Sequence, residues 1–204
     1  MPKLLREYFS LDDVDPKEVK KTFENEGKII LRGVMQRADT LNQNGRVYPM
    51  AILQREVRNY QKFIIENRAT GELDHPPEST ISFKNVSHIV REMYMDGKDV
   101  LGSIEVLHRV PSGMILKGLV EHGVKIGISS RGVGDVEEKG NYSVVLDNFQ
   151  MICVDVVSDP STVQAFMLPE CKNVSVSDLH NLRRHFTKED RINRVLNDIL
   201  CKER

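Results

Sequence analysis

The segment ISFKNVSHIVREMYMDGKDVLGSIEVL, residues 81–107, carries the clearest fold signal in the chain. It contains two runs with the composition of strands, and the dipeptide Asp96-Gly97 separates them. Asp-Gly is a strong turn signal, so the segment predicts a β-hairpin with strands at Ile81–Met95 and Asp99–Leu107. Further strands are predicted by the same criteria near residues 28–38, 124–131, 142–146 and 149–157.

Two obvious helices interrupt these strands. The first is amphipathic over about Pro49 to Asn67, where apolar residues recur at steps of three and four: Ile52, Leu53, Val57, Tyr60, Phe63 and Ile64. The second is short, with Ser112 as its expected N-cap and Gly123 past its end. Many strands with few helices predict an α+β fold on an antiparallel or mixed sheet, either open or curled into a barrel.

The composition changes at both ends of the chain. Residues 1–26 are charged and weakly periodic, and we interpret them as an N-terminal arm. Residues 27–169 hold the predicted strands and form the predicted central domain. Residues 170–204 are strongly charged with a helical pattern, so we expect a C-terminal helical appendage.

The overall composition excludes several classes of protein. With 29 basic and 30 acidic side chains the formal net charge is -1, which argues against a general nucleic-acid-binding surface. No apolar run is long enough to span a membrane, and we expect no secretory signal at the N-terminus. Three widely spaced cysteines do not suggest a disulfide framework, so we expect an intracellular, reducing compartment.

Two short stretches combine reactive residues with tight-turn signals. In GELDHPP, residues 71–77, Pro76 favours an extended backbone at His75, which makes that imidazole a candidate general base. In VKIGISSRG, residues 124–132, strand alternation places Ser129 on the face opposite the neighbouring isoleucines. Ser129 is therefore a candidate nucleophile, and the backbone N–H groups of Arg131 and Gly132 are candidate oxyanion donors.

A third stretch, CVDVVSDPS at residues 153–161, contains a carboxylate inside an apolar strand. Burying an isolated carboxylate is costly, so Asp155 needs a partner, and an imidazole would serve. A serine hydrolase requires a hydroxyl, an imidazole and a group that orients the imidazole. Ser129, His75 and Asp155 supply these three groups, although sequence spacing alone does not show that they meet.

Taken together, these stretches resemble the prohead (prehead core) serine proteases of tailed bacteriophages. The resemblance covers about residues 28–169 and rests on four blocks in the family's order: NGRVYP at 44–49, GELDHP at 71–76, GISSRG at 127–132, and VDVV at 154–157 followed by Pro160-Ser161. It implies a mostly antiparallel, β-barrel-like core surrounded by a few helices, as in the related herpesvirus assembly proteases. The domain at residues 27–169 would then be the protease domain.

The resemblance also implies a function. Such a protein is a serine endopeptidase that needs no cofactor or metal and cleaves scaffold, major capsid and internal prohead proteins during capsid maturation. It works inside the immature prohead in the host cell cytoplasm, where self-association is expected, and binds neither a specific nucleic acid nor a membrane. By position, His75 is the base, Ser129 the nucleophile and Asp155 the third member, where herpesvirus relatives use a second histidine.

Several alternatives stay open at this point. Ser130 is an alternative nucleophile. Glu72 could orient His75, but we interpret it as a turn or surface residue. The chain could be a non-catalytic capsid-assembly protein that kept a protease-like fold, or a metal-dependent hydrolase using Glu72, Asp74 and His75, although no HExxH pattern accompanies them.

Overall fold

The computed structural model describes residues 3–6, 27–76, 78–158 and 167–169. The chain divides into two compact units, Met1–Glu170 and Cys171–Arg204, and all the described residues belong to the first. The predicted appendage at 170–204, most of the predicted arm at 1–26 and the Pro160-Ser161 pair lie outside the described residues. The predicted domain boundaries therefore stay predictions.

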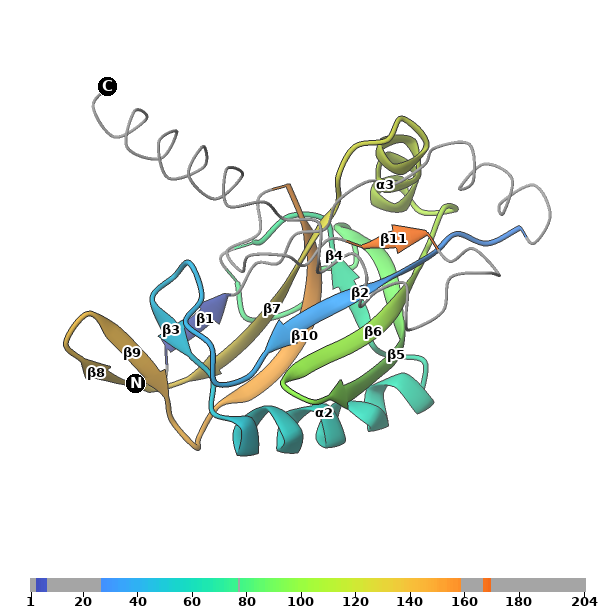
Figure 1. Ribbon diagram of the computed structural model, residues 1–204. Helices are drawn as coiled ribbons and strands as arrows, with labels where there is room; N and C mark the ends of the chain where they lie inside the picture. Colours follow the sequence, from blue (N-terminus) through green and yellow to red (C-terminus); the bar gives the residue numbers. More distant parts are fainter. Residues whose placement is uncertain (1–2, 7–26, 77, 159–166, 170–204) are drawn as a thin grey trace, which may run out of the picture. The chain divides into compact units, whose positions relative to one another are not determined.

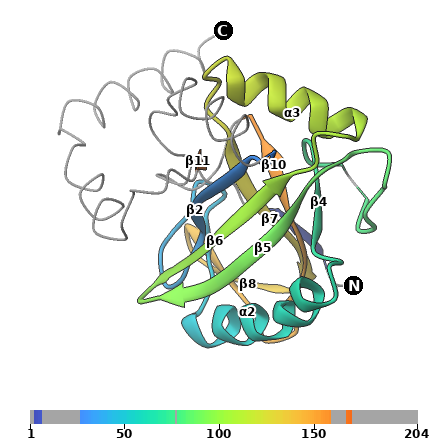
Figure 2. The ribbon, with the colours of Figure 1, turned by 90° about the vertical axis from the view of Figure 1, so that its right-hand side faces the viewer.

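The largest sheet has five strands in the order β11-β2-β6-β5-β4, and all its neighbours are antiparallel (Figures 1 and 2). Its strands are β2 (Ile30–Arg37), β4 (Thr70–Glu72), β5 (Val86–Asp96), β6 (Asp99–Val106) and β11 (Leu168–Pro169). The predicted hairpin is confirmed as β5-β6, with Gly97 in the left-handed conformation at φ 58°. Strand β5 begins at Val86, because the backbone turns between Ser82 and Asn85.

Two three-stranded sheets complete the β-structure. One is antiparallel in the order β1-β7-β10, with β1 (Lys3–Arg6), β7 (Gly127–Gly134) and β10 (Gln150–Val157). The other has the order β3-β9-β8, with β3 (Arg46–Val47), β8 (Val136–Lys139) and β9 (Tyr142–Val145). The sequence patterns do not predict β1, β3, β4, β8 or β11, which are two to four residues long.

The α+β class is confirmed, but the described strands form separate sheets and no closed barrel. An isolated parallel bridge between Leu73 and Val156 links the end of β4, in the five-stranded sheet, to β10 of the β1-β7-β10 sheet, where a barrel would need a continuous ladder. The composition of the strands could not distinguish these two outcomes, since both bury the same apolar faces. The predicted likeness to herpesvirus assembly proteases stays a prediction.

Two helices pack against the sheets. Helix α2 (Met50–Ile65) lies on β5 and β10 and buries four of the residues that predicted it: Ile52, Leu53, Val57 and Tyr60. Helix α3 (Pro111–Glu121) lies against β5 and β6 (Figure 2). Its N-cap is Val110 and not the predicted Ser112, whose hydroxyl instead donates to the carbonyl oxygen of Lys84 at 3.2 Å.

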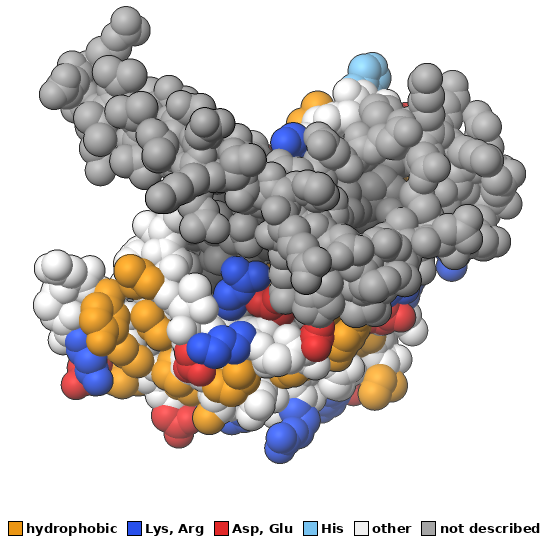
Figure 3. Space-filling model, viewed as in Figure 1, with side chains coloured by type: hydrophobic (Ala, Val, Ile, Leu, Met, Phe, Trp, Pro, Cys, Tyr) orange, Lys and Arg blue, Asp and Glu red, His pale blue; other side chains and the backbone are white. Residues whose placement is uncertain are grey.

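The described surface is mixed in charge. On the face drawn in Figure 3, basic and acidic side chains are interspersed with apolar ones over the part that is coloured by residue type. Neither α2 nor α3 has the length and apolar composition needed to cross a bilayer, and the same holds for all helical segments among the described residues.

Candidate active site

The antiparallel pairing of β7 with β10 brings two of the predicted residues together. In this register Asp155 lies directly opposite Ser129, and Cys153 lies opposite Arg131. Directly opposed residues of an antiparallel pair project from the same face of the sheet, as do residues two apart on one strand. Ser129, Arg131, Cys153 and Asp155 therefore form one polar group on a single face of the β7-β10 pair.

The segment that follows β4 adds the histidine. Its backbone is fixed to β10 by the bridge between Leu73 and Val156 and by the Asp74 amide, which donates to the Val156 carbonyl oxygen at 2.7 Å. Asp74 has φ 64°, the left-handed conformation, which turns the chain sharply before His75 and Pro76. His75 is thus held next to Asp155, which precedes Val156 on β10.

The three side chains form a continuous hydrogen-bonded chain. His75 Nδ1 lies 2.9 Å from Asp155 Oδ2, and His75 Nε2 contacts Ser129 Oγ. Because a carboxylate only accepts hydrogen bonds, Nδ1 carries a proton and the neutral ring presents the Nε2 lone pair to the hydroxyl. This geometry allows the imidazole to remove the hydroxyl proton while the carboxylate stabilises the imidazolium.

The environment of Asp155 keeps its carboxyl group ionised. Burial alone would raise the pKa of Asp155, but the hydrogen bond from His75, the charge of Arg131 and the backbone amide of Glu72 together hold the pKa below its ordinary value. The Glu72 amide donates to Asp155 Oδ1 at 3.0 Å. Asp155 is therefore a negatively charged partner for His75 despite being fully buried.

The side chain of Arg131 was missed by sequence analysis, which considered its backbone amide alone. The guanidinium is fully buried, lies 2.9 Å from Asp155 through Nε, and also donates to Glu72 Oε2. The interpretation of Glu72 as a turn or surface residue was wrong, because Glu72 ends strand β4 and is fully buried. Strand alternation contained the signal, since an arginine two residues after Ser129 shares its face and needs a buried counterion.

The remaining predicted residues also have defined places. Ser130 projects from the opposite face of β7, towards the hydrophobic core that contains Ile128, and its buried Oγ has no hydrogen-bond partner among the described residues. Arg131 and Gly132 lie inside β7, where both pair with β10 on one side and with β1 on the other. The assignment of their amides to an oxyanion site stays a prediction.

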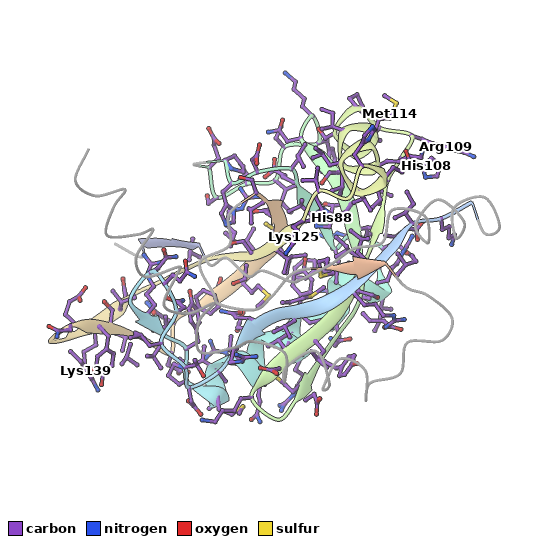
Figure 4. All side chains as sticks on the ribbon, turned by 45° about the horizontal axis from the view of Figure 1, so that its top comes forward. His88, His108, Arg109, Met114, Lys125 and Lys139 are labelled. Carbon is purple, nitrogen blue, oxygen red and sulfur yellow. The ribbon has the colours of Figure 1, made fainter. Side chains whose placement is uncertain are left out.

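Two further histidines contrast with His75. His88 is fully buried on β5 and contacts the carbonyl oxygen of Val154 through Nε2 at 3.0 Å. His108 lies in a turn after β6, and Figure 4 shows it near α3, well away from His88. Within the ranges that the structure covers, no three His, Cys, Asp or Glu side chains are grouped to hold a metal ion.

A hydrogen-bonded serine, histidine and aspartate is the arrangement that serine hydrolases use on several unrelated folds. Comparison with known proteins identifies the family. The sequence model of the family "Prohead core protein serine protease" matches residues 11–178, and the chain belongs to this family. The match extends beyond residues 28–169, from which the resemblance was inferred.

Individual relatives agree with this assignment. The prohead core protein protease of Enterobacteria phage T4 is 30% identical over 146 residues, which cover 70% of this chain and 69% of the relative. The solved structure of the bacteriophage T4 capsid assembly protease superposes with a TM-score of 0.68 at 25% identity, covering 78% of this chain and 99% of that one. The family and these relatives make the chain a protease of phage capsid assembly.

Proposed function

We propose that this protein is a serine endopeptidase in which Ser129 is the nucleophile, His75 the general base and Asp155 the group that orients His75. The observation that carries the proposal is the continuous contact from Asp155 Oδ2 through both nitrogens of His75 to Ser129 Oγ. The family name supplies the serine class independently of this geometry. Ser130 is disfavoured as the nucleophile because its hydroxyl faces the core and does not contact His75.

The proposed reaction follows from the positions of these groups. His75 Nε2 takes the Ser129 proton as Oγ attacks the scissile carbonyl, and Asp155 stabilises the imidazolium that forms. The imidazolium then protonates the leaving amine, and water hydrolyses the acyl-enzyme with His75 again acting as base. We assign the oxyanion to backbone N–H groups near Arg131 and Gly132, by resemblance to the family. No step requires a metal ion or an organic cofactor.

The biological part of the proposal rests on the relatives. We propose that the substrates are scaffold, major capsid and internal proteins of the immature prohead, and that the protein acts inside this particle in the host cytoplasm. Self-association within the prohead is part of the same proposal. The competing proposal, a non-catalytic assembly protein, is less well supported because all three reactive groups are present and in contact.

The test compares three versions of the purified chain: the parent, Ser129→Ala and Ser130→Ala. Each is incubated with a fluorophosphonate probe and, separately, stored and followed by mass spectrometry for self-trimming and for cleavage of added scaffold protein. We expect the parent and Ser130→Ala to be labelled and to cleave, also in EDTA, and Ser129→Ala to lose at least about 10⁴-fold of the activity.

The alternatives give different results. Labelling and cleavage that are lost in Ser130→Ala and kept in Ser129→Ala would assign the nucleophile to Ser130. Activity that EDTA abolishes would favour the metal-dependent hydrolase. A parent chain that neither labels nor cleaves, although it folds and enters proheads, would favour the non-catalytic assembly protein.

A further inference from the structure

Three charged side chains are buried together beside His75. Arg131, Glu72 and Asp155 each have no exposed surface, and the guanidinium of Arg131 contacts both carboxylates. Two carboxylates and one guanidinium leave this group with one net negative charge when His75 is neutral. Burying ions is costly, so an ion group of this kind is weak evidence for a purely stabilising role.

The contacts of Arg131 fix the carboxylate that orients His75. Arg131 Nε lies 2.9 Å from Asp155 Oδ2, and an Arg131 terminal nitrogen lies 3.2 Å from Asp155 Oδ1. Oδ2 is also the oxygen that faces His75 Nδ1. The planar guanidinium therefore holds both oxygens of Asp155 in one orientation, and the imidazole that hydrogen-bonds to Oδ2 is oriented with them.

The same pair of residues also holds the segment that carries His75. Arg131 donates to the carbonyl oxygen of Glu78 at 2.7 Å, and Glu72 Oε1 accepts from the amide of Ser82 at 2.9 Å. Both contacts lie on the far side of His75 in sequence, whereas the Glu72 amide, on the near side, donates to Asp155. The ion pair thus connects the chain before and after the histidine to the strand that holds the nucleophile.

The charge of Glu72 has a separate consequence. If Arg131 faced Asp155 alone, its positive charge would cancel the carboxylate that stabilises the imidazolium. With Glu72 present, one negative charge is left over, and it is neutralised when His75 takes the proton of the nucleophile. The negative charge of the group is therefore uncompensated in the resting state and is compensated when the imidazolium of His75 forms. A site that stabilises the charged intermediate more than the resting state lowers the reaction barrier.

The other titratable groups around Asp155 do not disturb this balance. Cys153 on the same strand donates to Asp155 Oδ1 at 3.3 Å, and the charge of Asp155 also acts on His88 of β5 and Tyr60 of α2. Burial raises the pKa of Cys153 and of Tyr60 and lowers the pKa of His88 to about 4. All three are therefore uncharged near neutral pH.

We propose that Arg131 and Glu72 are a positioning pair for the catalytic triad: Arg131 fixes the orientation of Asp155, and Glu72 offsets the Arg131 charge so that the site favours the imidazolium of His75. This inference rests on the proposed function, because it assumes that His75 is the base. It goes beyond that function by giving a role to two side chains outside the chain of contacts that joins Asp155, His75 and Ser129.

The test separates charge from structure with glutamine substitutions. Glu72→Gln removes a negative charge, Arg131→Gln removes the positive charge, and the double variant removes both and restores one net negative charge. The matched control is Glu56→Gln. Glu56 on α2 is another buried glutamate that pairs with an arginine, and it accepts a hydrogen bond from the Met151 amide at 2.7 Å.

Two readouts are compared over pH 5 to 9. One is the second-order rate of fluorophosphonate labelling of Ser129, whose acid limb reports the base, and the other is the NMR titration midpoint of the His75 ring in a Ser129→Ala background. We expect Glu72→Gln to move both midpoints down by about one pH unit and Arg131→Gln to move them up. The double variant should return them to the parent position while labelling stays at least about 10-fold slower, because Asp155 has lost the contacts with Arg131 that fix its orientation.

The outcomes distinguish positioning from folding. A Glu72→Gln variant that folds and leaves both midpoints unchanged would overturn the inference, and so would an equal shift in Glu56→Gln. If Arg131→Gln does not fold, Glu72→Gln and the double variant decide. If Ser129→Ala stays active, the proposed function fails, while the NMR midpoints still report whether the two charges act on His75.

Discussion

Acid should destabilise this protein through His88, a histidine outside the proposed triad. His88 lies on β5, and its Nε2–H donates to the carbonyl oxygen of Val154 on β10, so it connects the five-stranded sheet to the β1-β7-β10 sheet. Its Nδ1 accepts from the hydroxyl of Ser87 at 2.9 Å. Burial disfavours the charged ring and lowers the pKa of His88 from 6.5 to about 4, although the charge of Asp155 and the Val154 carbonyl partly offset the effect of burial.

The size of the effect follows from this difference. The pKa of His88 is lower in the folded chain than in the unfolded chain, so between pH 6.5 and pH 4 the unfolded chain binds more protons. The stabilisation is complete above pH 6.5 and is lost as the pH falls. We expect a loss of about 2 kcal/mol by pH 5 and about 3 kcal/mol by pH 4, out of a total of about 5–15 kcal/mol for a typical domain.

The assay is urea unfolding at pH 7.5, 6.5, 5.5 and 5.0 in a Ser129→Ala background, which prevents self-cleavage. His88→Gln keeps a donor for the Val154 carbonyl but cannot titrate, and His122→Gln removes an exposed imidazole as the control. The midpoint of the parent should fall by about 1 M more than that of His88→Gln over this range. Parallel pH curves for the parent and His88→Gln would refute the reasoning, whatever their absolute stabilities.

Two other predictions concern the packing around the site. Gly71→Ala should lower the free energy of unfolding by at least about 2 kcal/mol in the same urea assay, since an added Cβ would lie 2.0 Å from the Val154 carbonyl oxygen. The control is Gly118→Ala on α3, where an added Cβ meets open space and should stabilise the protein by up to about 1 kcal/mol. Equal effects of the two substitutions would contradict the close packing at Gly71. Cys153 should resist N-ethylmaleimide at pH 8 in the folded protein, because the thiol is buried and burial raises its pKa, and peptide mass spectrometry showing alkylation as fast as in urea would count against this.

Much of the fold could be predicted from local patterns. The β5-β6 hairpin follows from an Asp-Gly turn between two strand-like runs, and α2 follows from a long apolar stripe. Strand β4 could not be predicted in this way, because Thr70–Glu72 has no strand composition and is extended only because it pairs with β5. Its partners on β5 lie 14 to 19 residues further along the chain, so the information that makes it a strand is not local.

In the candidate site too, local patterns predict the residues but not their arrangement. The residue types required for a serine hydrolase identified His75, Ser129 and Asp155 as candidates, and the structure places the three in contact. Their convergence could not be read from the sequence, because it depends on the register of β7 against β10 and on a left-handed turn at Asp74. Glu72 was misread because a short polar segment usually lies on the surface, and its buried partner is 59 residues away.

The register of β7 and β10 connects the hydrophobic core to the reactive groups. Ile128, Val154 and Val156 belong to the core, and they alternate with Ser129 and Asp155 on the other face of the same two strands. A shift of one residue would turn every apolar side chain out of the core and every polar one into it, so burial of the apolar face fixes the register.

The irregularity between Met151 and Cys153 makes this register compatible with the rest of β10. Before it, Met151 lies opposite Gly132, and after it Cys153 lies opposite Arg131, so one extra residue is absorbed in β10 and the polar face is restored for Asp155. The cost of this arrangement falls on Ser130, whose hydroxyl is buried on the apolar face without a partner among the described residues. The apolar residues of the core therefore place Ser129 opposite Asp155, although they lie on the other face of the two strands.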